Sequence, residues 1–342
     1  MKLLIYVPIL SPRIKYIFSF IFNDVLRTEI DFTVDAAEFV QSALPKFSYA
    51  EQPLGNELFF KSTALLFEHK IVARQIQTIG FGEMKVPFPV TSSELPFDVF
   101  AASFYFLSRY EEYVHANQSA DSSYPFGNSL QYHLNLLELP VIDGWALLLK
   151  NILLKHFPVL SFEHKTFSFL PLHLLDQPEK SAGKPFIHKV GTFLRNFIKN
   201  TMHIRRDKPA AIKQFLIAMQ NEGVAQNASL LIPREKTDGH FFPELQIPKS
   251  YVSLTRNKAE NDYSMYYSGY PGFRAGTCTP FYWYDLQLEK KTQLLLHPVA
   301  TTDTSLLNNK TAEVLLLKLN ELINSVKLVN GNFYFLSLRH DI

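Results

Sequence analysis

The stretch DYSMYYSGYPGFRAGTCTPFYWYD, from Asp262 to Asp285, constrains the fold more than any other part of the sequence. Its three glycines, Gly269, Gly272 and Gly276, permit backbone conformations that other residues rarely adopt. Its two prolines each fix a backbone dihedral and donate no hydrogen bond. Arg274 lies among these turn-forming and aromatic residues, so a charge is held in an apolar setting. A functional loop and an aromatic-rich structural crossing both remain open interpretations.

Composition indicates a soluble globular protein with two domains. The chain has 342 residues, 47% hydrophobic and 19% charged, and this length exceeds one small core. The formal net charge of +2 argues against a nucleic-acid partner, and no apolar stretch reaches transmembrane length. The single cysteine, Cys278, excludes an internal disulfide and a multi-cysteine zinc site. Because the apolar N-terminal run is followed by no signal-peptide cleavage site, we expect a cytoplasmic location.

Apolar patterning predicts that the chain opens with an α/β unit. The segments Leu3–Val7 and Glu29–Val34 have the composition of strands. Between them, Ser11 followed by Pro12 is typical of a helix start, with serine as the N-cap. Asp35 is a candidate N-cap for a second, short helix.

The clearest predicted helix is Leu95–Tyr113, with Asp98 as its N-cap. Its charged end contains Glu111 and Glu112, which resemble a paired acid and base. Adjacent helical residues point in different directions, so we interpret this pair as a solvated face. A second amphipathic helix is expected at Trp145–Phe157.

The second half of the chain is predicted to form another α/β unit. Phe167–Leu175 and Phe333–Leu338 have strand patterns, and Thr311–Leu328 has the pattern of a long helix. We place the domains at 1–165 and 166–342, and expect those two strands to be neighbours.

Several blocks of the sequence resemble a known family. They include LLIYVP from Leu3, PLGNELFF, LPFDVFAASFYFLSRYEEY, PGFRAGTCTPFYWYD and LLLHPVA. These blocks are similar to bacterial polysaccharide deacetylase-like proteins that carry an extra N-terminal α/β domain of unknown function. The resemblance implies that the second domain is an irregular (β/α) barrel, here incomplete. It also implies removal of acetyl groups from N-acetylated sugars with a bound divalent metal.

The resemblance assigns roles to four positions. Asp176 matches the usual metal ligand, and Leu174 occupies the place of the carboxylate base. Arg274 matches the arginine that supports that base, and His340 matches the general acid. The family's His-x-x-x-His metal motif is missing, since no two of the eleven histidines are four residues apart. A leucine accepts no proton, so the catalytic set is degenerate.

Other residues are weaker candidates. His240 and His297 are expected to approach the mouth of the barrel if they take part at all. His173 has the pattern of a core histidine, because residues three apart on a strand face opposite sides. Cys278 has no matching base, and a buried thiol is the expected state.

Arg274 needs a new anionic partner if its family partner is replaced by Leu174. A buried guanidinium without an acceptor costs several kcal/mol, on an order-of-magnitude scale. We expect Asp176 to be that partner, with Asp262, Asp285 and loop carbonyls as alternates. In this interpretation the arginine fastens the Gly-rich loop to the first barrel strand.

Three functions remain open from the sequence. The first is a deacetylase-like pseudoenzyme that binds a glycan or another protein, with no cofactor expected. The second is an active metal-dependent deacetylase with a rearranged site, which would hold zinc. The third is a structural or assembly role through the N-terminal domain. Bound zinc at near-stoichiometric level separates the second from the first.

Overall fold

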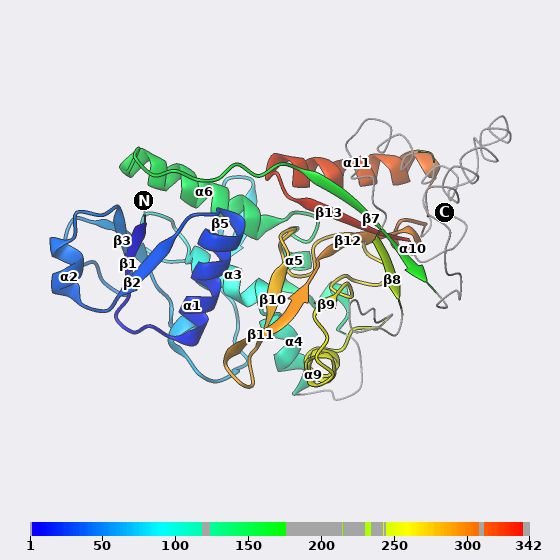
Figure 1. Cartoon of the computed structure of the whole chain (residues 1–342), viewed down its shortest axis with the longest axis horizontal. Helices are drawn as coiled ribbons and strands as arrows, with labels where there is room; N and C mark the ends of the chain where they lie inside the picture. Colours follow the sequence, from blue (N-terminus) through cyan, green and yellow to red (C-terminus); the bar gives the residue numbers. More distant parts are fainter. Residues whose placement is uncertain are drawn as a thin grey trace, which may run out of the picture.

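Within the residues that the structure describes, the chain forms four β-sheets with helices packed around them (Figure 1). These residues are 2–117, 124–175, 214, 230–233, 242, 244–307 and 311–337 of a computed structural model. Two parallel sheets lie toward opposite ends of the long axis. A small sheet of β9 (Asn261–Asp262), β10 (Phe281–Asp285) and β11 (Lys290–Leu296) lies between them (Figure 1). The architecture is mixed α/β, as the sequence predicts.

The N-terminal sheet is parallel throughout, in the order β2-β1-β3-β4. On one face, Leu3 and Ile5 of β1 join a core that contains Phe18 of helix α1. On the other face, the ring of Tyr6 contacts Phe39 of helix α2. Both faces are therefore covered, which suits a parallel sheet. The elements of this unit are β1 (Leu3–Tyr6), α1 (Pro12–Ser19), β2 (Ile30–Thr33), α2 (Ala36–Gln41), β3 (Lys46–Ala50) and β4 (Leu58–Lys61).

The predicted helix starts in this unit are confirmed. Ser11 accepts a hydrogen bond from the Ile14 amide at 3.0 Å, and Pro12 is the first residue of α1. Asp35 accepts from the amide of Ala37 at the start of α2. Beyond its predicted span, α1 continues as a π-helical segment, η1 (Phe20–Val25).

The predicted helix Leu95–Tyr113 is wrong as one continuous element. The structure has α3 (Val99–Leu107) followed by α4 (Tyr110–Ala116), and Arg109 between them is left-handed, with φ of 55°. The N-cap prediction holds, because Asp98 accepts from the Ala101 amide at 3.0 Å. The chain therefore turns at Arg109, and the residues after it face a direction that a regular helix would not give them.

The second parallel sheet has the order β12-β13-β7-β8. It places β7 (Ser168–Leu175) beside β13 (Asn332–Ser337), with Phe333 opposite Phe169, and this confirms the predicted neighbours. The edge strands are β12 (Val299–Thr302) and β8 (Leu230–Pro233). The residues described by the structure contain no closed barrel. Helix α11 (Ala312–Leu328) packs on this sheet and begins after the N-cap Thr311.

The hairpin of β10 and β11 shares a core with the first part of the chain. Trp283, Tyr284 and Leu294 belong to the same buried cluster as the side chains of β1 and α3. The Tyr16 hydroxyl also donates to the Tyr282 carbonyl at 2.7 Å. The domain boundary at residue 165 stays a prediction, and this hairpin packs across it.

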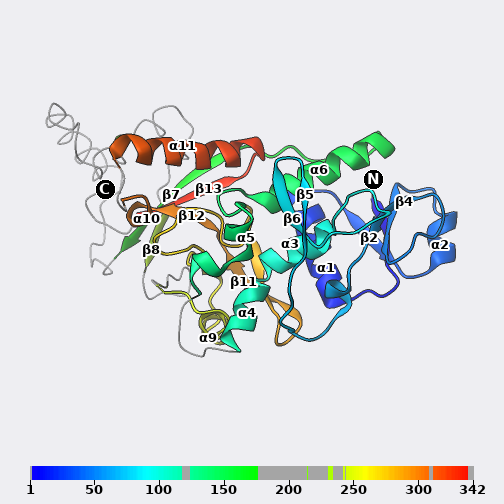
Figure 2. The same ribbon diagram turned by 180° about the vertical axis from the view of Figure 1, so that it is seen from behind.

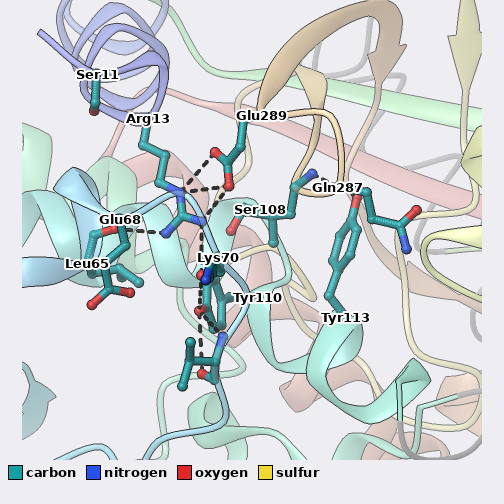
Figure 3. Close-up of polar contacts among 12 residues, drawn as sticks. Ser11, Arg13, Leu65, Glu68, Lys70, Ser108, Tyr110, Tyr113, Gln287 and Glu289 are labelled. Carbon is teal, nitrogen blue, oxygen red and sulfur yellow. Dashed lines mark hydrogen bonds and ion pairs between the residues drawn. The ribbon is translucent and has the colours of Figure 1, made fainter.

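A buried ion pair fastens the hairpin to α1 (Figure 3). Arg13 donates through Nε to Oε2 of Glu289 at 3.0 Å, and Glu289 lies in the turn between β10 and β11. The same guanidinium donates to the Leu65 carbonyl at 2.8 Å. It also lies 5.5 Å from the ring centre of Phe104 and 5.7 Å from that of Tyr110. Aromatic faces and oxygens therefore surround this charge on several sides.

The remaining elements connect these layers. In the view of Figure 2 the hairpin of β5 and β6 is in front. In the described part of the chain, no helix combines the length and apolar character needed to span a bilayer. The elements not yet given are η2 (Ala64–Phe67), β5 (Thr78–Phe81), β6 (Met84–Pro87), η3 (Phe126–Asn128), α5 (Leu130–His133), α6 (Val141–His156), α9 (Lys249–Arg256) and α10 (Asp303–Leu307).

Candidate functional site

The Gly-rich segment between β9 and β10, residues 263–280, is called the central loop here. Gly269, Gly272 and Gly276 all have positive φ, at 84°, 146° and 71°. A Cβ atom on Gly272 would lie 2.5 Å from the carbonyl oxygen of Leu137, closer than any contact allows. The predicted need for glycine is confirmed at this position, because the loop backbone presses against the segment before α6.

Arg274 of the central loop is buried and pairs with Glu112 of α4. Its Nε donates to Oε1 at 2.9 Å and its Nη2 to Oε2 at 2.6 Å, so the contact is bidentate. Nη1 donates to the Tyr266 carbonyl at 2.9 Å. The expectation that Asp262 or Asp285 takes this role is corrected. Loop carbonyls do contribute as expected, and Asp176 lies outside the described residues.

The interpretation of Glu111 and Glu112 as a solvated pair is wrong. Glu111 is 9% exposed and Glu112 is 2% exposed. The reason is the left-handed conformation of Arg109, which ends α3 and restarts the helix in a new direction. A sequence pattern for one continuous helix cannot place side chains that follow such a turn.

Arg109 joins the two glutamates to the central loop. Its Nε donates to Oε1 of Glu112 at 2.8 Å, and its Nη2 donates to Oε1 of Glu111 at 2.9 Å. The remaining donors reach Oε1 of Gln131 and the hydroxyl of Tyr267, both at 2.8 Å, and the carbonyl of Arg274. Every N–H of the guanidinium is used, so this buried charge is fully satisfied.

Arg109, Glu111, Glu112 and Arg274 together form what we call the buried charge network. Burial by itself raises the pKa of Glu112, but the charges of Arg274 and Arg109 outweigh it and hold that pKa below its usual value. Burial raises the pKa of Glu111, and Arg109 opposes this only in part. The ring of Tyr267 lies 4.7 Å from the Arg274 guanidinium and 5.9 Å from that of Arg109. Two cations and two carboxylates balance in a site closed to water.

A second contact holds the far end of the central loop. Asp143, in the first turn of α6, accepts from the hydroxyls of Thr277 and Thr279, each at 2.6 Å. It also accepts from the Cys278 amide at 3.1 Å. The Cys278 thiol is buried as expected, and desolvation raises its pKa. A buried thiol with a raised pKa is a poor nucleophile.

His297 lies between β11 and β12, beside residues of the second sheet. Its ring stacks on Tyr263 at 4.4 Å between centroids and is within hydrogen-bond distance of two oxygens. These are the Tyr334 hydroxyl at 3.2 Å and Oδ1 of Asn261 at 2.9 Å. Burial lowers its pKa to about 4, so the ring is neutral at pH 7.

Two further acidic residues have local partners. Asp285 accepts from the amides of Gln287 and Leu288, at 2.9 and 3.3 Å, and so closes the turn of the β10–β11 hairpin. Asp262 accepts from the amide and hydroxyl of Ser264, at 3.0 and 2.7 Å. Burial raises the pKa of Asp262 to about 6. Among the described candidates, Arg274, His297 and Asp285 form no hydrogen bond or ion pair with one another.

The other predicted site residues lie beyond what the structure describes. Asp176, His240 and His340 are outside the described residues, so their convergence with Arg274 stays a prediction. Leu174 lies in β7, where its backbone pairs with Ile232 of β8. Among the residues described here, no three His, Cys, Asp or Glu side chains are grouped as metal ligands. This part of the chain does not fit the divalent ion that the family resemblance implies.

The sequence reasoning missed Arg109 and Glu112 as the centre of the site. The available signal was the run SRYEEY, three charges that directly follow the apolar segment FAASFYFL. Charges at the end of a helix that is buried all round need internal partners. The partner of Glu112 is 162 residues away, and no local pattern identifies it.

Comparison with known proteins adds one finding on the first half of the chain. Residues 3–158 match the model of a family of unknown function, DUF7033. No curated protein and no solved structure matches. The matched segment contains Arg109 and Glu112, whereas Arg274 lies outside it. The buried charge network therefore joins the matched segment to the rest of the chain.

Replacing Arg274 is expected to lower stability strongly. Arg274→Ala leaves the buried Glu112 carboxylate with Arg109 as its remaining cation, and breaking a buried pair costs about 3–5 kcal/mol. Arg274→Lys restores only part of this, since lysine lacks the bidentate fork. Urea unfolding of the variants and the wild type measures both effects.

The matched control is Lys318→Ala. Lys318 pairs with Glu138 and Glu321, but it is partly exposed, so its loss costs about 1 kcal/mol or less. Arg274→Ala that unfolds at the same urea concentration as the wild type contradicts the structural role.

The stability contributed by Asp262 is expected to depend on pH. Its folded pKa of about 6 is above the ordinary value, so its contribution is complete below about pH 4 and is lost as pH rises through 6. Relative to Asp262→Asn, the wild type should lose on the order of 3 kcal/mol between pH 4 and 7. Urea unfolding of both proteins across this range measures the difference. A constant difference would show that Asp262 ionises normally.

Proposed function

We propose that this protein is a deacetylase-like scaffold with impaired catalysis that works by binding a glycan. The observation that carries the proposal is the bidentate contact of Arg274 with Glu112. In the family that the sequence resembles, the matching arginine orients the carboxylate base. Here the base position is Leu174, and the arginine's charge is balanced inside the buried charge network.

The chemistry of amide hydrolysis explains why catalysis is impaired. An attacking water must lose a proton to a base, and a leucine side chain cannot accept one. A divalent ion would polarise the carbonyl and acidify the water when bound, and it needs several anionic or imidazole ligands. The sequence lacks the paired histidines, and the described residues supply no replacement set.

The rest of the scaffold supports a protein that keeps the deacetylase type of fold. The pairing of β7 with β13 is what an incomplete (β/α) barrel of that type requires of its first and last strands. The central loop keeps its glycines and its arginine, and Asp143 and Glu112 hold it from two sides. These contacts preserve shape, and shape is sufficient for a binding protein.

The test is acetate release and ligand binding, measured on one preparation. The tetramer of β-1,4-linked N-acetylglucosamine is the probe, with and without equimolar zinc. We expect calorimetry to detect binding and an enzymatic acetate assay to detect no turnover in either condition.

Acetate release that depends on zinc and is abolished by Asp176→Ala would instead establish an active deacetylase. Neither binding nor release would favour a structural role through the N-terminal domain.

A further inference from the structure

A cavity of about 800 Å³ opens on the N-terminal sheet, away from the central loop. Its floor is formed where the parallel strands end: Pro8 follows β1, Glu51 follows β3, and Lys61 ends β4. The size is within the range of small-molecule sites, which is about 300–1,000 Å³.

The cavity lies where the strand order reverses. The order β2-β1-β3-β4 means that the chain moves from β1 to one neighbour and then returns to add β3 on the other side. In open parallel sheets, ligands bind outside the carboxyl ends of the strands at such a reversal. Pro8 and Glu51 follow the two strands that flank it.

The polar groups that line the cavity are available for a ligand. Within the described residues, the side chains of Glu51, Lys61, Ser62 and Gln77 form no hydrogen bond or ion pair. They offer a carboxylate, an ammonium, a hydroxyl and an amide. A ligand with many hydroxyl groups could donate to and accept from all four.

Apolar groups complete the lining. The ring of Phe67 is held by stacking on Tyr49, with centroids 6.0 Å apart, and Ile79 of β5 is on the wall formed by the β5–β6 hairpin. A wall of this kind suits the C–H face of a pyranose ring, whose edge carries the hydroxyls. Mixed lining of this type fixes orientation through a few polar contacts.

The charges argue against an anionic ligand. The cavity carries one cation and one anion, Lys61 and Glu51, so its formal charge balances. The nearby start of α1 is occupied, because Ser11 caps it and donates to the Leu66 carbonyl at 2.5 Å. Arg13 is turned to Glu289. The donors that bind phosphate at many strand-order reversals are thus committed elsewhere.

We propose that this cavity binds a neutral, hydroxyl-rich sugar unit and is the glycan-binding site of the protein. The assignment rests on the proposed glycan-binding function and adds its location and the ligand's chemical class. Lys61 and Ser62 donate to sugar oxygens, Glu51 accepts from a hydroxyl, and Phe67 packs against the ring.

Calorimetry with the N-acetylglucosamine tetramer tests the proposal on the full chain. Lys61→Ala and Glu51→Gln should each weaken binding about tenfold, the loss expected for one hydrogen bond to a charged group. Ala64→Trp, at an exposed lining position, should abolish binding by filling the cavity. The control is Lys2→Ala, an exposed lysine beside β1 that pairs with Asp31, and it should bind like the wild type. Thermal melting verifies that each variant is folded.

Failure of the site and failure of the function give different results. Wild-type binding that all three cavity variants retain would overturn the site while the glycan-binding function stands. Acetate release from the tetramer by the wild type would overturn the function. ATP that binds in place of the tetramer, with Lys61→Ala abolishing it, would overturn the neutral-sugar assignment. A wild type that binds neither probe would overturn the site as well.

Discussion

The Glu112 carboxylate, buried between the guanidinium groups of Arg109 and Arg274, is the interaction on which the rest of the structure depends. A carboxylate this far from water persists in its charged form only with close cations and hydrogen-bond donors. Glu112 has both, from α4 itself and from the central loop. The same contact fixes the turn at Arg109 and the path of the loop, so neither is free to move alone.

Two further buried contacts extend this connection. Arg13 of α1 holds the β10–β11 hairpin through Glu289, and Asp143 of α6 holds Thr277 and Thr279. All three contacts join the first 160 residues to the segment between β9 and β11. The first part of the chain and the central loop therefore act as one packed body. A loop so constrained suits a fixed binding surface better than a site that must rearrange during turnover.

Local features of the fold could be predicted from the sequence because their causes are local. Ser11, Asp35 and Asp98 cap helices that begin where they are expected, since a capping side chain bonds to amides two or three residues away. The pairing of β7 with β13 was also foreseen, from a family resemblance. The buried charge network was not foreseen, because a left-handed residue and a partner 162 positions distant leave no periodic signal. Asp176, His240 and His340 lie outside the described residues and stay predictions.

A double-mutant cycle between Arg274 and Glu112 tests this account most directly. The free energy of unfolding would be measured for the wild type, Arg274→Met, Glu112→Gln and the double variant. If the pair joins the loop to α4, each single change is costly and the double variant costs less than their sum. We predict a coupling energy of about 2 kcal/mol or more, within the range of residues in direct contact. Costs that add within about 0.5 kcal/mol would contradict the central role of this ion pair.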